Sequence, residues 1–250
     1  MDNIKIADGF ATVDAGMTSF LMIGQSNMAG RGDFGVVPPI ENDRCFMLRM
    51  GRWQKMSEPI NPDRGIFDGP YRSGVGLAAS FADEYAKHFQ QNIGLIPCAD
   101  GGTGIDQWQP GEVLFDHAVM MTKLALRTSK LGGILWHQGE HDCRNDDLVK
   151  AYKEKFLVMI TALRKELGAE QLPVILGELS TGPAPEGRLF ERRTALNGIF
   201  AELAEEVPLC AVASAAGFRL RVDNIHFDSP SYREFGKRYF RKYLDLAEKR

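Results

Sequence analysis

Residues 19–30 read SFLMIGQSNMAG, and this stretch decides the fold. Its first part, Ser19 to Ile23, is a short and almost wholly apolar run, typical of a strand in a parallel sheet covered on both faces. The run ends at Gly24 and passes at once into polar residues. We therefore expect a buried strand, a tight turn and the start of a helix, with Ser26 at the turn.

The same kind of apolar run recurs along the chain, at Ile93 to Cys98, Gly133 to His137, Val174 to Glu178 and Leu209 to Ser214. Apolar residues at three- and four-residue steps predict helices between these runs, over Val75 to Gln90, Asp146 to Leu167 and Gly187 to Glu206. A last helix is expected from Ser229 as N-cap and Pro230 to about Lys249. The alternation predicts an α/β, three-layer αβα, doubly wound fold around a parallel five-stranded sheet.

The stretch from Arg31 to Ser73 breaks this rhythm, since it contains five prolines and a single strand-like run around Cys45 to Met50. Long irregular segments of this kind often form lids or substrate walls. No linker or internal repeat divides the chain. We expect a single domain over residues 1–250, with a long irregular insertion at about 31–73.

The composition is that of an ordinary globular protein: 44% of the 250 residues are hydrophobic, 25% are charged, and the net charge is -3. Because Lys and Arg are dispersed among acidic residues, we expect no binding to nucleic acid or to an anionic membrane. Neither a signal peptide nor a run of about 18 apolar residues is visible. A cytoplasmic protein is expected, with secretion after removal of a signal as the alternative.

The four cysteines, Cys45, Cys98, Cys143 and Cys210, are too far apart along the chain for a C-x-x-C metal-ligand pair. We expect reduced thiols in or near the core, with one disulfide pair as the alternative. The sequence gives no indication of the oligomeric state.

Polar residues gather where the expected strands end, and before the last helix. The clusters are Gly24 to Met28, Asp100 to Thr103, His137 to Glu140, and Asp223 to His226. Ligands of open parallel sheets bind beyond the carboxyl ends of the strands. The four clusters are therefore expected to meet at one edge of the sheet.

These clusters contain the residue types of serine catalysis. A serine hydroxyl needs an adjacent base to take its proton and a third group to orient that base. Ser26 is placed to be the nucleophile, His226 can be the base, and Asp223 is close enough in the chain to orient the imidazole. An oxyanion needs further donors: the N–H of Ser26, an N–H of the glycine turn at 101–102 and the amide of Gln138 are the candidates.

Four motifs, read together, resemble the SGNH (GDSL-like) hydrolases, and within them the carbohydrate esterase branch of acetylxylan esterases and sialate O-acetylesterase-like proteins. They are GQSNMAG at 24–30, GGTGIDQW at 101–108, WHQGEHD at 136–142 and DNIHFD at 223–228. The resemblance covers nearly the whole chain. It implies a flavodoxin-like fold, a Ser26, Asp223 and His226 triad, and an oxyanion hole formed by Ser26, a glycine of the GGT turn and Gln138. We assign the glycine as Gly102, and Gln138 stands where the wider superfamily has asparagine.

The function that follows is a serine esterase that hydrolyses O-acetyl esters of a carbohydrate through an acetyl-serine intermediate, with no metal or organic cofactor. The expected partner is an acetylated sugar or oligosaccharide. Residues expected to support the catalytic groups or to contact substrate are Gln25, Asn27, Glu140 and Trp108, and Asp142 is expected to hold Gln138 by hydrogen bonding. A short-chain lipid or thioester esterase of the same fold is one alternative, and a non-catalytic carbohydrate-binding protein is another.

Residues 137–141 also read as H-x-x-E-H, the inverted zinc-peptidase motif. That motif requires a helix, on which both histidines share one face and bind one metal. Here the motif follows an apolar run and contains Gly139 at its centre. A strand end followed by a turn is the favoured interpretation.

Overall fold

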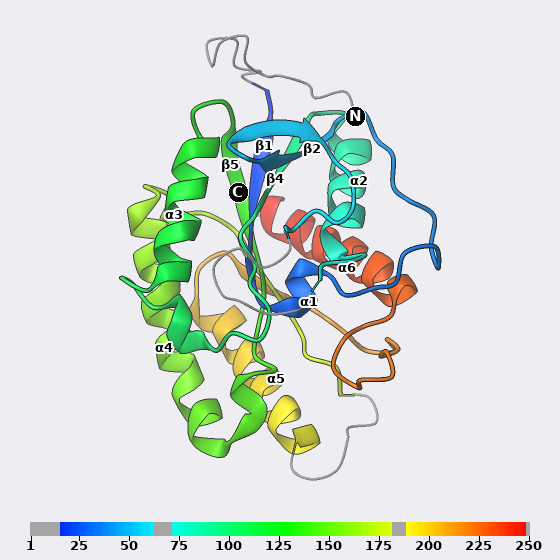
Figure 1. The fold of residues 1–250 in the computed structure, drawn as a ribbon. Helices are drawn as coiled ribbons and strands as arrows, with labels where there is room; N and C mark the ends of the chain where they lie inside the picture. The colour runs from blue at the N-terminus through cyan, green and yellow to red at the C-terminus, as the bar shows by residue number, and fades with distance from the viewer. Residues whose placement is uncertain (1–15, 63–71, 182–188, 249–250) are drawn as a thin grey trace.

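The computed structural model describes residues 16–62, 72–181 and 189–248, and its centre is a seven-stranded sheet (Figure 1). The strands are β1 (Thr18–Gly24), β2 (Cys45–Arg49), β3 (Arg52–Lys55), β4 (Ile93–Pro97), β5 (Lys130–His137), β6 (Val174–Gly177) and β7 (Cys210–Ala213). Their order in space is β3-β2-β4-β1-β5-β6-β7. All neighbouring strands are parallel except β2 and β3, which are antiparallel.

The predicted α/β class is confirmed, whereas the predicted number of strands is not. The five expected strands are β1, β4, β5, β6 and β7, and their relative order is 2-1-3-4-5, the flavodoxin-like arrangement. Two more strands extend the sheet beyond β4, and both come from the segment expected to be an irregular insertion. The run around Cys45 forms β2. The short β3 was not expected because polar residues surround Trp53, its one fully buried side chain.

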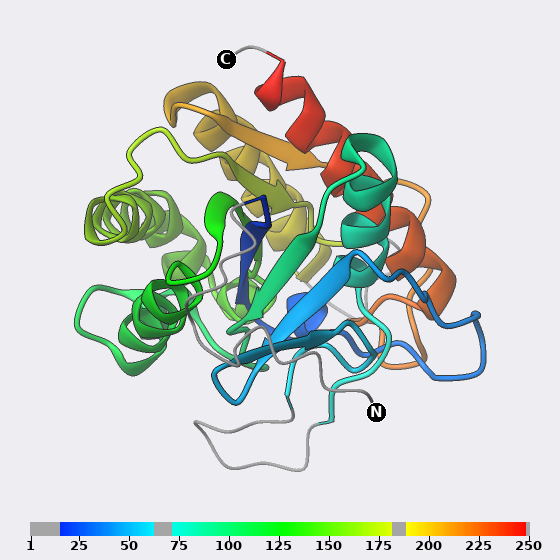
Figure 2. The same cartoon turned by 90° about the horizontal axis from the view of Figure 1, so that it is seen from above.

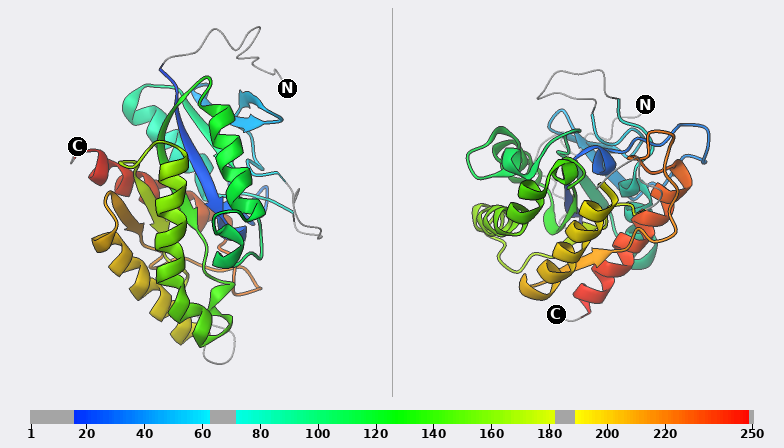
Figure 3. Two further views of the ribbon diagram at one scale, coloured as in Figure 1. Left: turned by 90° about the vertical axis from the view of Figure 1, so that its left-hand side faces the viewer. Right: turned by 90° about the horizontal axis from the view of Figure 1, so that it is seen from below.

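Helices cover both faces of the sheet. They are α1 (Ser26–Ala29), α2 (Leu77–Phe89), α3 (Val113–Ala125), α4 (Asp146–Glu166), α5 (Leu189–Glu206) and α6 (Ser229–Ala247). Viewed along the sheet, α2 and α6 lie on one side and α3 and α4 on the other (Figure 2). The left view of Figure 3 shows α3, α4 and α5 in front of the same face of the sheet.

The side chains of β1 pack against the helices on both faces of the sheet. Successive residues of a strand point to opposite faces. Leu21 and Ile23 pack in the cluster under α3, α4 and α5, whereas Phe20 and Met22 pack in the cluster under α2 and α6. All four are at most 1% exposed, which explains the continuous apolar run in the sequence.

The last helix begins where the sequence indicated, with one difference at its first turn. Asp228, not Ser229, is the N-cap: its carboxylate accepts a hydrogen bond from the backbone N–H of Ser231 at 2.9 Å. Pro230 then falls in the first turn, where its missing N–H costs nothing. The capping residue lies two residues after His226, so His226 comes just before the start of α6.

Each of the four cysteines is buried and unpaired, in agreement with the expected thiols. Within the described ranges, no helix has the length and apolar character to span a bilayer.

Candidate active site

The ends of β1 and β5 lie side by side, with Gly24 opposite His137 in the register of the two strands. A Cβ atom added to Gly24 would lie 2.1 Å from the carbonyl oxygen of His137, and the φ of Gly24 is 127°. Glycine alone accommodates both conditions. The chain therefore leaves the sheet close to β5, and Ser26 follows as the first residue of α1.

Ser26, His226 and Asp223 form a continuous hydrogen-bonded relay. The Oγ of Ser26 lies 2.8 Å from Nε2 of His226, and Nδ1 of His226 lies 2.8 Å from Oδ2 of Asp223. The other carboxylate oxygen of Asp223 accepts the backbone N–H groups of Ile225 and His226, each at 2.9 Å. The three residues thus have the spatial arrangement of a nucleophile, a base and the group that orients the base.

The charge of Asp223 sets the tautomer of His226. Partial burial works against ionisation of the carboxyl, but the hydrogen bonds from His226 and Ile225 hold the pKa of Asp223 below its ordinary value. An ionised Asp223 accepts a hydrogen bond from Nδ1–H of His226, which keeps the proton on Nδ1. This leaves Nε2 as an acceptor for the hydroxyl proton of Ser26.

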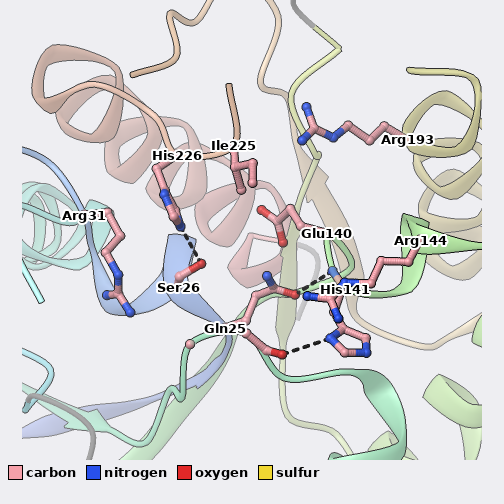
Figure 4. Close-up of a pocket in the computed structure, with 11 residues that line it drawn as sticks. Gln25, Ser26, Arg31, Glu140, His141, Arg144, Arg193, Ile225 and His226 are labelled. Carbon is pink, nitrogen blue, oxygen red and sulfur yellow. Dashed lines mark hydrogen bonds between the residues drawn. The ribbon is translucent and has the colours of Figure 1, made fainter. Parts of the chain in front are cut away.

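The relay opens into a cavity of about 290 Å³, near the lower end of the usual size for ligand pockets, roughly 300–1,000 Å³. Its lining includes the glycine turn, Ile225, Gln25 and several ionisable side chains: Arg31, Arg144, Arg193, Glu140, His141 and His226. Figure 4 shows Ser26 and His226 pointing toward one another at one side of this cavity, with Arg144 and Arg193 on the opposite side. Positive charge therefore predominates around the nucleophile.

Two backbone N–H groups border the cavity next to Ser26. Gly102 has a φ of 79°, and nothing lies within 4 Å of the position that a Cβ would take there. Neither Gly102 nor Ser26 donates its N–H to another backbone group in the described segments, apart from bonds inside helices. Both residues line the cavity, and an oxyanion needs N–H donors of this kind.

The amide of Gln138 is placed differently from the expectation. Gln138 is fully buried, and its NH2 group lies near three acceptors: Oε1 of Gln25, the carbonyl oxygen of Thr103 and the carboxylate of Asp142. An amide has two hydrogens, so both are engaged. Donation to an oxyanion would require one of these bonds to break, whereas the expected bond to Asp142 is present.

Gln25 joins the loop after β5 to the nucleophile. Its Oε1 accepts the backbone N–H groups of Gly139 at 3.2 Å and His141 at 3.3 Å, in addition to the amide of Gln138. Because Gln25 directly precedes Ser26, these bonds set the position of the loop relative to the nucleophile.

Glu140 lies in the same loop, and its side chain is only 6% exposed. Burial alone would raise its pKa, but the electrostatic attraction of His137 and hydrogen bonds from His137 and Asn27 lower the pKa of Glu140 to about 2. Oε1 is the atom that both partners contact. Oε2 has no hydrogen-bond partner in the described part of the chain.

Trp108 does not reach the cavity, which corrects the expectation that it contacts substrate. It is 1% exposed, its Nε1 donates to Oγ1 of Thr103 at 3.2 Å, and its ring packs edge-on against Trp136. A ring enclosed in this way packs against the glycine turn on the side away from the cavity and cannot stack on a sugar.

The zinc-peptidase interpretation of residues 137–141 also disagrees with the structure. His137 is the last residue of β5, and Gly139 turns the chain with a φ of 142°. The ring of His137 faces Glu140, whereas Nδ1 of His141 lies 2.9 Å from the carbonyl oxygen of Gly102. The two histidines therefore do not share a helix face. The described residues contain no cluster of His, Cys, Asp and Glu suited to a metal ion.

The sequence alone did not indicate the arginines of the cavity. Arg144 and Arg193 come from a short 3-10 helix (Asp142–Arg144) and from α5, and their positions in the chain carry no motif. Arg31 directly follows the motif that contains Ser26, and that proximity was the one available signal.

Comparison with known proteins identifies a matching family and a related plant protein. The family described as carbohydrate esterase, sialic acid-specific acetylesterase, matches residues 16–245. A probable carbohydrate esterase of Arabidopsis thaliana is 28% identical over 247 residues, covering 90% of this chain and 89% of the relative.

Solved structures show the same architecture. An Arabidopsis thaliana protein superposes with a TM-score of 0.79 at 27% identity, over 91% of this chain and 98% of that one. The structure of NanS gives a TM-score of 0.75 at 16% identity, over 96% and 100% of the two chains. A carbohydrate acetylesterase from Xanthomonas citri gives 0.61 at 19% identity, over 93% of this chain and 57% of that one. At such low identity, the last two similarities show the fold alone.

Proposed function

Because the chain belongs to the carbohydrate esterase family of sialic acid-specific acetylesterases, we propose that it removes O-acetyl groups from a sugar, with Ser26 as nucleophile, His226 as general base and Asp223 as the orienting carboxylate. The observation that carries the proposal is the relay of two 2.8 Å contacts that ends at a cavity. No metal ion takes part in this scheme.

The reaction begins when Nε2 of His226 accepts the hydroxyl proton of Ser26 and Oγ attacks the acetyl carbonyl carbon. The backbone N–H groups of Ser26 and Gly102 stabilise the oxyanion. Each such donor contributes about 3–4 kcal/mol to lowering a barrier of this kind. The intermediate collapses, the bond to the sugar oxygen breaks, and His226 returns its proton to that oxygen, leaving acetyl-Ser26.

Water completes the cycle. His226 takes a proton from the water as the water oxygen attacks the acetyl carbon, and the second oxyanion forms at the same site. Its collapse breaks the ester bond to Oγ, and His226 returns the proton to Ser26. The products are acetate and the free enzyme.

The charges of the cavity favour an acidic sugar as the substrate. Arg193 is 2% exposed, and among the described residues its hydrogen bonds go to the backbone carbonyl oxygens of Ser180 and Asn224. Arg144 is exposed at the cavity and forms no ion pair with the residues described. Guanidinium groups in these positions can bind a carboxylate of the substrate, as an O-acetylated sialic acid would provide.

The test compares hydrolysis of p-nitrophenyl acetate with longer acyl esters, O-acetylated sialic acid and acetylated xylan oligosaccharides, for wild type and Ser26→Ala. We expect activity confined to short acyl groups and abolished by the substitution. Full activity of Ser26→Ala would disprove the mechanism. A preference for long acyl chains would favour the lipid or thioester esterase. Sugar binding without hydrolysis of any of these esters would favour the non-catalytic binding protein.

A further inference from the structure

The segment that carries Asp223 and His226 lies at the surface of the protein. Val222 is completely exposed, and Asn224 has a φ of 55°, in the left-handed region. The turn closes on itself through a hydrogen bond of 2.7 Å from the N–H of Arg221 to the carbonyl oxygen of His226. None of these features fixes the position of His226 relative to Ser26, which lies 200 residues earlier in the chain.

Asn27 links the two segments, because its side chain contacts the backbone on both sides of His226. Its Nδ2 donates to the carbonyl oxygen of Ile225 at 3.1 Å, and its Oδ1 accepts the N–H of Phe227 at 3.4 Å. Asn27 is also the next residue after Ser26. We propose that Asn27 is a positioning residue that holds the base within hydrogen-bond distance of the nucleophile; this inference rests on the proposed function.

Neighbouring side chains fix which way the amide of Asn27 points. An ionised Glu140 can only accept, so the NH2 group of Asn27 faces its Oε1. The hydroxyl of Tyr232 donates to Oδ1 from the other side. Burial raises the pKa of Tyr232, so this hydroxyl keeps its proton. Exchange of the two ends of the amide would place Oδ1 against the oxygen atoms of Glu140 and Ile225, and the NH2 group against the N–H of Phe227.

Burial makes the arrangement stiff. Asn27 is 1% exposed, and Tyr232 and Phe227 are fully buried. Water cannot readily replace a bond that is lost there, and an unsatisfied buried donor or acceptor is costly. Glu140 is itself held by His137 at 3.1 Å. The position of His226 is thus connected, through Asn27, to the end of β5.

A displaced base reduces the rate of proton transfer more than it reduces substrate binding. A misplacement of about 1 Å can cost on the order of 100-fold in rate. For Asn27→Ala we therefore expect kcat to fall by about 10- to 100-fold, with KM for p-nitrophenyl acetate nearly unchanged.

Asn197 provides a matched control for general loss of stability. Its amide makes the same kind of two-way contact with backbone, accepting the N–H of Leu179 at 2.8 Å and donating to the carbonyl oxygen of Leu179 at 2.9 Å. Asn197→Ala should lower the melting temperature as Asn27→Ala does, while kcat stays close to wild type. Equal losses of kcat in the two variants would overturn the proposal.

A double-substitution experiment separates positioning from any other role. If Asn27 acts through His226, Asn27→Ala has nothing further to disturb in a His226→Ala enzyme, and its effect on the residual rate should vanish. A loss as large in that background as in wild type would show that Asn27 does not act through His226.

Tyr232→Phe serves as the second variant if Asn27→Ala does not fold. It removes the hydroxyl that donates to Oδ1 of Asn27, and we expect a several-fold loss of kcat that disappears in the His226→Ala background; an unchanged kcat contradicts the proposal. Ser26→Ala is measured in parallel. Full activity of Ser26→Ala refutes the proposed function, whereas an inactive Ser26→Ala beside a fully active Asn27→Ala refutes the positioning role alone.

Discussion

Asp223 and His226 are three residues apart in one turn, and their side chains meet at 2.8 Å. The backbone N–H groups of Ile225 and His226 donate to the same carboxylate. The carboxylate therefore shapes the turn and orients the imidazole at once. Replacement of Asp223 should affect both the local backbone and the tautomer of the base.

Asp223→Asn should lower kcat by about 10³- to 10⁴-fold, because an amide can present NH2 to Nδ1 of His226 and so favour the wrong tautomer. The measurement is steady-state hydrolysis of p-nitrophenyl acetate. Asp43→Asn, which removes an exposed ion pair with Lys55, is the control and should leave kcat unchanged. A loss of less than about tenfold for Asp223→Asn would mean that Asp223 does not orient the base.

The pKa of Glu140 predicts a pH dependence of stability. It is about 2 in the folded protein and 4.5 in its ordinary state, so the unfolded chain binds the proton first as the pH falls. The stabilisation is complete well above pH 4.5 and is lost as the pH decreases toward 2. In Glu140→Gln this dependence should flatten, and stability at neutral pH should fall by roughly 3–5 kcal/mol, because a buried partner of His137 is lost.

Urea unfolding between pH 3 and 7 measures this effect. Glu166→Gln, at an exposed ion pair with Lys123, is the control and should follow the wild-type curve. A Glu140→Gln protein with the wild-type slope below pH 4.5 would show that Glu140 is not the group responsible.

Arg144→Ala should reduce kcat/KM for an O-acetylated acidic sugar by about 10- to 100-fold, the range for loss of a hydrogen bond between charged groups. Hydrolysis of p-nitrophenyl acetate, which has no carboxylate, should change little. Arg241→Ala removes an exposed arginine on α6 and serves as the control. Equal effects of Arg144→Ala on both esters would exclude a role in binding the acidic group.

Gly24→Ala should destabilise the protein by more than about 4 kcal/mol or prevent folding, since its Cβ would lie 2.1 Å from the carbonyl oxygen of His137. Gly168→Ala isolates the backbone contribution. Gly168 also has a positive φ, 59°, but nothing lies within 4 Å of its added Cβ, and its substitution should cost about 1–2 kcal/mol. Thermal unfolding of both variants checks the difference, and similar melting temperatures would rule out the steric explanation.

The sequence was most informative about features that depend on residues close together in the chain. The apolar run from Ser19 to Ile23 predicted β1 because a strand buried on both faces needs apolar side chains at every position. The pair Asp223 and His226 was recognisable because a three-residue spacing within one turn brings the side chains close without help from the rest of the fold. The family resemblance of the motifs agrees with the family match over residues 16–245.

Contacts between distant segments decided what the sequence left open. Gln138 and Trp108 looked like site residues from their motifs, yet packing directs Gln138 toward Asp142 and encloses Trp108 beneath the glycine turn. Arg193 reached the cavity only because α5 packs beside the loop that carries Asn224. β3 joined the sheet because Trp53 is buried against Gly94 of β4.

The sequence by itself thus determined the class of the fold, the strand ends where polar residues gather, and the local turn that pairs Asp223 with His226. Tertiary structure alone decided the partner of each buried polar group and the distance from Ser26 to His226. The physical reason is that apolar periodicity and short turns depend on neighbours in the chain. A buried hydrogen bond depends on which groups the folded chain brings within about 3 Å and shields from water.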